Sequence, residues 1–360
     1  MKTPKRYRFL YGVIVCLLSV CLTVCLAALS GCAPGKTEPT ETDDPPATTA
    51  PAEEEEEELP EYPVTIGDVT VRSRPSRVIS LSPGLTEKLY DLGLEEALAG
   101  VSDYCDYPEA VVGLPTCGTA QIPDLQEIEA LKPHLVLTQT PLPEETVIAL
   151  QQMQADVVVI PTATTVEGFK ENYISLAKLL EGTYTGGDMG TRFAANVQDR
   201  LDYLAGYLVP YAEENGVKPA LYLRLLEFNV ATGDTLEHEL MEIIGLKNIA
   251  AEQTGWLYPE EIAKGAGRAD FQSLAVMFMD DEFVTIKHLE QNAFYKGLNA
   301  TLKDYFLYID SLVFERQSLR MLDILEEMAL YAYPEATPPL PFGDTEEDGA
   351  NVKDAKKDNA

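Results

Sequence analysis

The sequence predicts an α/β protein made of two Rossmann-like lobes with mostly parallel sheets, joined by one long α-helix. Three observations support this fold class: short apolar runs alternate with amphipathic stretches, one amphipathic stretch near the middle is much longer than the others, and the two halves contain similar short sequences. Unbroken apolar strands separated by helices are typical of parallel sheets that are covered on both faces. The folded part, from about residue 60 to 334, is long enough to build two such lobes.

The first half contains four expected strands and four expected helices, which we assign to an N-terminal lobe spanning 61–185. The strands are expected at Val78–Leu81, Leu98–Val101, Leu135–Thr138 and Val157–Ile160. The helices are expected at Leu85–Leu92, Leu125–Leu131, Glu144–Met153 and Val166–Leu180.

A single apolar stripe marks the long helix, which we assign to a bridging segment spanning 186–216. Apolar side chains recur every three or four residues at Phe193, Val197, Leu201, Leu204, Leu208 and Tyr211. A glycine-rich break at 183–187 precedes it, so we expect the helix to begin at about Asp188. If it continues to Glu214 it is about 40 Å long, although Pro210 would kink it or end it early.

Alternation resumes in a C-terminal lobe spanning 217–334. Strands are expected at Leu221–Leu225, Leu274–Met279 and Phe306–Ile309, and helices at Leu236–Ile244 and Ser318–Leu330. Two short sequences of the first half recur here in the same order. Leu89–Leu94 resembles Met241–Leu246, and Gln126–Ile128 has a counterpart in Glu260–Ile262. We therefore interpret the two lobes as related.

The N-terminus has the layout of an export signal. Basic residues and no acid occupy the first ten positions, and an apolar run follows from about Tyr11 to Leu29. The run could nearly span a bilayer, so an uncleaved anchor is the alternative. Leu29-Ser30-Gly31-Cys32 resembles the bacterial lipobox, in which the cysteine thiol receives the lipid. We therefore expect a lipoprotein signal peptide at 1–31 and lipidation of Cys32, which places the protein on the outer face of the bacterial cytoplasmic membrane.

Two segments are expected to be disordered. An acidic tether at 32–60 is rich in Pro, Thr, Gly and acid and ends in the run Glu53–Glu58, and a polar tail occupies 335–360. The net formal charge of −32 argues against binding to a phosphate backbone, so we exclude nucleic acid as a partner.

The sequence lacks the motifs of common enzymes and metal sites. The three histidines, His134, His238 and His288, are too scattered to predict a metal centre. His238–Glu242 begins like the H-E-x-x-H zinc helix but ends in Glu242. The glycine-rich Gly182–Gly187 lacks the Gly-Lys-Ser/Thr of a phosphate loop, and no G-x-S-x-G elbow occurs. We therefore predict a non-enzyme without a resident metal or cofactor.

Only Cys105 and Cys117 remain once the signal and the lipid site are removed. An even pair in an exported protein favours a disulfide, which would contribute about 3 kcal/mol on the chain-entropy model. Two unpaired buried thiols are the alternative, and both interpretations stay open here.

Several motifs occur together in an order that resembles one family. They are Pro75–Pro83 with Leu85–Glu87, Gly100–Pro108, Leu125–Val136, Ala231–Thr235, Asn248–Ala250 and Phe314–Arg316. The chain resembles the iron-siderophore/cobalamin substrate-binding proteins of ABC importers, the class III or helical-backbone type, and is most similar to the cobalamin-type members. The resemblance covers most of residues 63–334. It implies two lobes bridged by a single helix, with the solute held in a cleft between them.

The resemblance also implies partners. Family members present one carboxylate from each lobe to arginines of the permease, which works with an ATPase. Glu260 matches in the C-terminal lobe. In the N-terminal lobe the matching position is Gln126, so either the adjacent Glu127 substitutes or that contact is weaker. We expect the protein to be a monomer.

Cleft residues are expected after the carboxyl ends of the strands, where open α/β sheets bind ligands. In the N-terminal lobe these segments are Ser82–Thr86, Tyr104–Tyr107, Thr119–Gln121 and Gln139–Pro141, and in the C-terminal lobe they are Glu227–Asn229, Trp256, the region of Asp280 and Arg316. The expected ligand-binding residues are Ser82, Pro83, Thr86, Tyr104, Asp106, Tyr107, Gln121, Phe228, Trp256 and Arg316. Tyrosine and tryptophan suit a large, flat, amphipathic ligand, because their faces cover apolar area while OH and NH groups meet polar edges. For each aromatic residue, packing within its own lobe is the alternative.

The solute is expected to be a corrinoid such as cobalamin. Haem and ferric siderophores carry acidic groups that call for Arg or Lys in the cleft, and only Arg316 stands out there. The sequence departs from the cobalamin-type pattern at Gly118–Gln121, where an aromatic residue often occurs. The alternatives are a haem or ferric-siderophore binder and, from another class, a surface sensor or interaction lipoprotein that reuses the fold.

Overall fold

The computed structural model describes residues 59–224, 229–258, 261, 273–279 and 305–336. All of them belong to one structural unit that starts at residue 58. The expected signal peptide, Cys32, almost all of the tether and most of the tail lie outside the described residues, as do Phe228 and Glu260.

A parallel four-stranded sheet forms the centre of the N-terminal lobe, in the order β4-β3-β5-β6. Its strands are β3 Val78–Ser80, β4 Leu98–Val101, β5 Leu135–Thr138 and β6 Asp156–Val159. The helices of this lobe are α2 Pro83–Asp91, α3 Leu125–Leu131, α4 Glu144–Gln152 and α5 Val166–Glu181, with 3-10 turns η2 Glu95–Ala97 and η3 Glu109–Gly113. The expected strands and helices are therefore all present, with ends shifted by no more than a few residues.

An antiparallel hairpin precedes this sheet and was not expected from the sequence. It pairs β1 Val64–Ile66 with β2 Val69–Val71. Its turn has a positive φ at Gly67, the conformation that glycine adopts without steric cost. Val64 and Val71 bury their side chains in the core of the N-terminal lobe.

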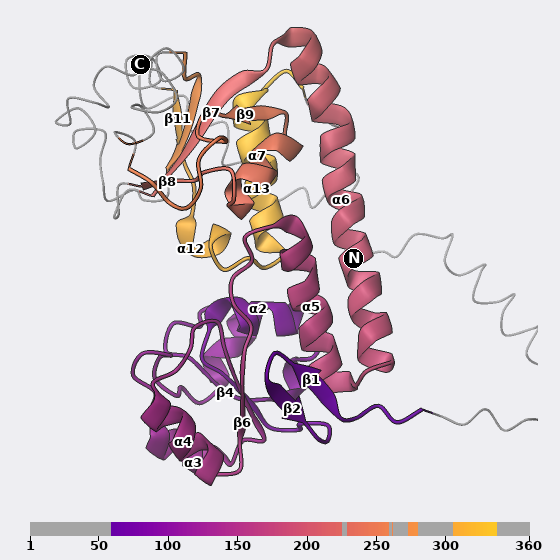
Figure 1. Ribbon diagram of the computed structural model, residues 1–360, viewed down its shortest axis with the longest axis vertical. Helices are drawn as coiled ribbons and strands as arrows, with labels where there is room; N and C mark the ends of the chain where they lie inside the picture. Colours follow the sequence, from indigo (N-terminus) through magenta and orange to yellow (C-terminus); the bar gives the residue numbers. More distant parts are fainter. Residues whose placement is uncertain (1–58, 225–228, 259–260, 262–272, 280–304, 337–360) are drawn as a thin grey trace, which may run out of the picture. The chain divides into compact units, whose positions relative to one another are not determined.

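The long helix α6 Thr185–Asn215 connects the two lobes. Figure 1 shows it beside α5 and then beside α7 Leu236–Ile243, and it contacts both. Pro210 lies inside it without ending it. The helix begins three residues earlier than expected, because Gly186 and Gly187 belong to it and not to the preceding turn. A Cβ at Gly186 would lie 2.2 Å from the Ala177 carbonyl oxygen of α5, so glycine here permits a close helix crossing.

The C-terminal lobe contains a five-stranded sheet in the order β11-β10-β7-β8, with β9 also paired to β7. Its strands are β7 Lys218–Arg224, β8 Asn229–Val230, β9 Leu246–Asn248, β10 Val276–Met279 and β11 Phe306–Tyr308. Among the described strand pairs of this sheet, β7–β8 is antiparallel and the other three are parallel. Besides α7, the described helices of this lobe are α12 Ser311–Phe314 and α13 Arg320–Ala332. The short strands β8 and β9 and helix α12 were not expected.

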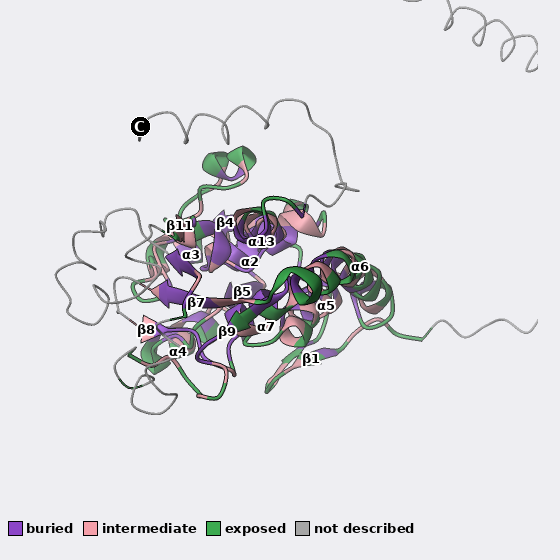
Figure 2. Ribbon diagram, turned by 90° about the horizontal axis from the view of Figure 1, so that it is seen from above, coloured by how far each residue is buried: buried purple, intermediate pink, exposed green. Residues whose placement is uncertain are grey.

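Each lobe has its own hydrophobic core, and α5 contributes side chains to both. Its Leu176, Leu179 and Leu180 pack in the N-terminal core, whereas its Phe169 and Tyr173 pack with α6 and the helices of the C-terminal lobe. Strands β4 and β7 are buried along most of their length (Figure 2). These observations confirm the predicted mixed α/β fold. Within the described residues, no helix has the length and apolarity needed to cross a bilayer.

Candidate functional site

The carboxyl ends of β3, β4 and β5 in the N-terminal lobe and of β11 in the C-terminal lobe lead into one cleft with a volume of about 460 Å³. Its described lining residues are Pro83, Gly84, Asp103, Tyr104, Asp106, Gln139, Ser311, Leu312, Glu315 and Arg316. The first six follow β3, β4 and β5, and the last four lie in α12 and the residues that follow it. We call this site the interlobe cleft. Its volume falls within the range of small-molecule sites.

Four of the expected ligand-binding residues line this cleft: Pro83, Tyr104, Asp106 and Arg316. Tyr104 is 67% exposed, so the face of its ring is available at the rim. Tyr107 is 44% exposed but lies beside the cleft, where the Arg320 guanidinium covers its ring at 4.0 Å from the centroid.

Ser82 and Thr86 do not line the cleft and serve the N-terminal lobe itself. Ser82 Oγ accepts a hydrogen bond from the Gln139 backbone N–H at 2.9 Å. Thr86 Oγ1 donates to Ser80 Oγ at 2.9 Å and is fully buried. Ser82 thus ties the loop after β3 to the loop after β5, whereas Thr86 bonds within the β3 end, to Ser80 and to the Ser82 carbonyl. Gln121 is exposed in a turn next to the Gly118–Pro123 bridge, away from the cleft.

Gly84 and Gln139 also line the cleft, inside the segments Ser82–Thr86 and Gln139–Pro141 that were expected there, whereas Asp103, Ser311, Leu312 and Glu315 were not expected. A Cβ on Gly84 would lie 2.3 Å from the Arg316 carbonyl oxygen, so this position has no room for a side chain. The Gln139 Nε2 group is buried and has no hydrogen-bond partner among the described residues. An amide donor in this position is available to a solute carbonyl.

Trp256 lines a second pocket of about 370 Å³ and not the interlobe cleft. This pocket is lined by Thr162, Ala163, Thr164, Arg224, Asp234, Thr235, Leu236, Glu237, Gly255, Trp256, Glu315 and Gln317. The Arg224 guanidinium lies 3.6 Å from the centroid of the Trp256 ring, and Arg224 Nε donates to Glu315 Oε1 at 2.7 Å. One face of the indole is therefore covered by its own lobe. Glu315 lines both pockets.

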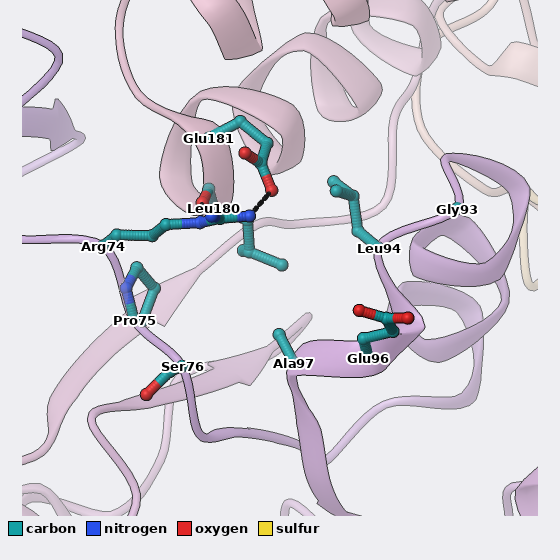
Figure 3. Close-up of a pocket in the computed structure, with 9 residues that line it drawn as sticks. All are labelled: Arg74, Pro75, Ser76, Gly93, Leu94, Glu96, Ala97, Leu180 and Glu181. Carbon is teal, nitrogen blue, oxygen red and sulfur yellow. Dashed lines mark hydrogen bonds and ion pairs between the residues drawn. The ribbon is translucent and has the colours of Figure 1, made fainter.

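A third hollow, of about 290 Å³, lies within the N-terminal lobe (Figure 3). Arg74 and Glu181 form an ion pair across it, and Arg74 Nε donates to the Leu180 carbonyl at 3.1 Å. Residues 74–76 precede β3 and residues 94–97 precede β4. The hollow is therefore at the opposite ends of the strands from the interlobe cleft, and we assign no solute to it.

Of the two interpretations left open for the cysteines, the structure has the unpaired one, with Cys105 and Cys117 both free thiols. Cys105 packs in the cluster that contains Val78, whereas Cys117 packs in the cluster that contains Ile79. Neighbouring residues of a strand point to opposite faces of the sheet, so the two thiols lie on opposite sides. Cys105 Sγ instead lies 3.2 Å from Thr86 Oγ1. Burial raises the pKa of Cys117 to about 12, so this thiol stays protonated and unreactive at neutral pH.

Charged side chains of α2 connect the two lobes beneath the cleft. Glu87 Oε1 accepts from Arg316 Nη1 at 2.8 Å and Glu87 Oε2 accepts from Ser318 Oγ at 2.6 Å. Lys88 Nζ donates to the Arg316 carbonyl at 3.2 Å. Asp91 Oδ2 accepts from the Leu319 N–H at 3.0 Å. We call these contacts between α2 and residues 316–319 the interlobe network.

Two other residues that the sequence singled out, Glu127 and His238, do not line the interlobe cleft. Glu127 is half-buried in the first turn of α3, where its backbone N–H donates to the capping Asp124 carboxylate at 3.1 Å. His238 lies on α7, with Nε2 3.7 Å from a Glu242 carboxylate oxygen. In the part of the chain that the structure describes, no three His, Cys, Asp or Glu side chains are placed to hold a metal ion.

Two α/β lobes, one long connecting helix and a cleft lined from both lobes define a solute-binding protein of the two-lobe class. The periplasmic binding protein family matches residues 78–312, and the chain belongs to this family. Its members are the substrate-binding components of ABC importers.

Relatives by sequence support this assignment. The chain is 26% identical over 287 residues to the uncharacterized ABC transporter substrate-binding lipoprotein YvrC of Bacillus subtilis, covering 76% of this chain and 87% of YvrC. It is 27% identical to the cobalamin-binding protein of Halobacterium salinarum, over 55% of this chain and 54% of that protein. It is 28% identical to the vitamin B12-binding protein of Yersinia pestis, over 49% of this chain and 60% of that protein. The chain thus spans little more than half of the two cobalamin-type relatives.

Solved structures support the fold. The periplasmic haem-binding protein HutB of Vibrio cholerae is similar with a TM-score of 0.60 and 20% identity, covering 72% of this chain and 99% of HutB. The periplasmic vitamin B12-binding protein BtuF of Vibrio cholerae is similar with a TM-score of 0.54 and 22% identity, covering 71% of this chain and 96% of BtuF. One fold thus accommodates both solute classes.

Proposed function

We propose that this chain is the lipid-anchored extracytoplasmic binding subunit of an ABC importer, and that it captures a corrinoid in the interlobe cleft. The observation that carries the proposal is that Arg316 is already paired with carboxylates of the protein itself. It is the only cation among the described residues that line the cleft, and its guanidinium is bound by Glu87 and Asp106. An anionic solute therefore finds no available positive partner among these residues, whereas a corrinoid with an amide rim needs none.

The other lining groups suit the same solute. The exposed Tyr104 ring and Leu312 offer apolar area at the rim, against which a flat macrocycle packs. The buried Gln139 amide N–H is positioned for a carbonyl on the rim of the macrocycle. A corrinoid is larger than the cleft volume, so we expect it to extend past Tyr104 into solvent. The two relatives named for cobalamin or vitamin B12 support this choice.

Capture is expected to involve little lobe motion. The interlobe network joins α2 to residues 316–319 through buried and partly buried hydrogen bonds, and α6 runs unbroken between the lobes. A solute thus meets a largely pre-formed site, and modest closure completes the contacts.

Titration of the purified soluble domain with cyanocobalamin, haemin and a ferric tris-catecholate tests the proposal. We expect one-to-one binding of cyanocobalamin and none of the other two. Tyr104→Ala should weaken cyanocobalamin binding about threefold to tenfold, because one ring contact is lost. The matched control is Tyr207→Ala, which removes an exposed tyrosine of α6 that does not line the cleft. Equal affinity of wild type and Tyr104→Ala would contradict the assigned cleft.

Haem is the second candidate, and the exposed tyrosine favours it. A phenolate oxygen is an established axial ligand of haem iron, and Tyr104 is the most exposed aromatic residue at the cleft. Haemin binding that is lost in Tyr104→Phe, without binding of cyanocobalamin, would replace the corrinoid assignment. If none of the three solutes binds, a surface sensor or interaction lipoprotein becomes the better interpretation.

Anchoring and docking complete the proposal. We expect lipid on Cys32, which Cys32→Ala should abolish in a labelled-palmitate assay. For the permease we propose contacts from Glu260 and from Glu127, whose position in the first turn of α3 leaves it partly exposed. Glu260→Lys should reduce stimulation of the transporter's ATPase without changing solute affinity. Unchanged stimulation would remove Glu260 from the docking surface.

A further inference from the structure

Arg316 uses both of its terminal nitrogens on the N-terminal lobe. Nη1 donates to Glu87 Oε1 at 2.8 Å and to Asp106 Oδ1. Nη2 donates to Asp106 Oδ2 at 3.2 Å and to the Tyr104 carbonyl at 3.3 Å. The Arg316 side chain is 11% exposed. The edge of the guanidinium that would bind a solute carboxylate is therefore filled by the protein's own acceptors.

The two carboxylates that hold Arg316 differ in their surroundings. Glu87 is 1% exposed and is also bound by Ser318 and by Arg320, whose Nη1 lies 3.3 Å from Oε1. Asp106 is 65% exposed, and within the described residues its carboxylate forms side-chain hydrogen bonds with Arg316. The hydrogen bonds and charge of Arg316 hold the pKa of Asp106 below its ordinary value, so Asp106 is ionised at neutral pH. Glu87 is thus the fixed partner of Arg316 and Asp106 the outer, exchangeable one.

We propose that Asp106 is a specificity-determining residue, which occupies Arg316 and thereby excludes anionic solutes from the interlobe cleft. The inference rests on the proposed function in that it takes this cleft as the solute site. Arginine binds carboxylates through two parallel hydrogen bonds, and Asp106 makes that kind of contact in place of a solute. An acidic solute must displace Asp106 while it also meets the two other carboxylates of the lining, Asp103 and Glu315.

The experiment compares Asp106→Asn with Asp103→Asn. Asp103 is the matched control, because it lines the same cleft and its carboxylate accepts from the Gly118 N–H at 3.0 Å rather than from Arg316. Both variants remove one negative charge from the cleft, but only Asp106→Asn leaves Arg316 without its outer carboxylate. Protoporphyrin IX is the acidic probe, since it carries two carboxylates and no iron that a tyrosine could bind. Its dimethyl ester is the neutral probe of the same shape.

We expect Asp106→Asn to bind protoporphyrin IX about tenfold to a hundredfold more tightly than wild type, as one charge-assisted contact is gained. The dimethyl ester should show no such gain, and Asp103→Asn should gain less than about threefold for the acid. Adding Arg316→Gln to Asp106→Asn should remove the gain. An equal gain in both single variants, or no gain in Asp106→Asn, would overturn the inference.

Cyanocobalamin titrated into the wild-type protein separates this inference from the proposed function. Failure of wild type to bind cyanocobalamin rejects the corrinoid assignment. The porphyrin comparison then still decides whether Asp106 excludes anionic solutes. Thermal unfolding of each variant verifies that it is folded.

Discussion

Lys88 is fully buried between the lobes and lies against two aromatic rings. Its Nζ lies 5.7 Å from the centroid of the Phe169 ring and 5.6 Å from that of Tyr173. The ionisable groups that attract its charge are Asp91 and Glu87, on its own helix. Burial nevertheless dominates and lowers the pKa of Lys88 from 10.5 to about 7.

This lowered pKa predicts a pH-dependent stability. The unfolded chain binds the Lys88 proton up to pH 10.5, whereas the folded protein releases it near pH 7. Between these values the unfolded state holds more protons, so the free energy of unfolding rises with pH, by at most about 1.4 kcal/mol per pH unit for this one group. Below about pH 7 the full cost of burying the charge is present.

Chemical denaturation of wild type and Lys88→Met between pH 7 and 9 measures this effect. We expect the difference in unfolding free energy to favour Lys88→Met most at pH 7 and to shrink toward pH 9. Lys247→Met, at an exposed position of β9, should follow the wild-type profile. A constant difference between wild type and Lys88→Met across this range would show that Lys88 keeps an ordinary pKa.

Single residues of the site were predictable only where their role follows from position along the chain. Pro83, Tyr104 and Asp106 follow strand ends and do line the cleft. Ser82 and Thr86 occupy equivalent positions but hydrogen-bond within their own lobe, because short hydroxyl side chains next to a strand end reach neighbouring backbone. The partners of Arg316 were not predictable, since Glu87 lies 229 residues away in sequence.

At the scale of elements, α5 and α6 cross closely because of glycine. A Cβ on Gly190 would lie 2.6 Å from the Ile174 Cα of α5, closer than real side chains approach. On the same helix, Gly206 is exposed and has nothing within 4 Å of an added Cβ. The two glycines therefore have opposite expected responses to the same substitution.

We expect Gly190→Ala to destabilise the protein by about 1–3 kcal/mol, because the added methyl group forces the two helices apart. Gly206→Ala should stabilise it by about 0.5–1 kcal/mol, since alanine has the higher helix propensity and meets no neighbour. Urea denaturation of both variants gives the comparison. A stabilising Gly190→Ala would mean that the crossing is looser than the structure shows.

Element prediction succeeded where local sequence determines the element and failed where a tertiary contact or a very short length does. Strands β4 and β5 match their predicted bounds, because each is an apolar run with flanking residues that end it. The start of α6 was placed too late, because Gly186 and Gly187 look like a turn when read locally. Their role in packing against α5 depends on a tertiary contact that local sequence does not carry. Strands β8 and β9 were missed because two or three residues are too few to show a period.

At the scale of the whole molecule, the packing between the two lobes determines whether they unfold together. Helix α5 contributes side chains to both cores, and the interlobe network adds buried and partly buried hydrogen bonds between α2 and the residues before α13. Shared packing of this kind couples the lobes, so we expect one cooperative unfolding transition for the wild-type protein.

Glu87 is the residue on which this coupling depends most, because its carboxylate binds Arg316, Ser318 and Arg320 of the other lobe at once. Removing it in Glu87→Ala leaves two arginines without this buried partner, which should cost about 3–5 kcal/mol. Differential scanning calorimetry should then show a lower first transition and a separate second one. Asp106→Ala removes the exposed partner of the same arginine and should cost less than about 1 kcal/mol while keeping a single transition. A single transition in Glu87→Ala, shifted no further than in Asp106→Ala, would show that α5 and α6 couple the lobes without the network.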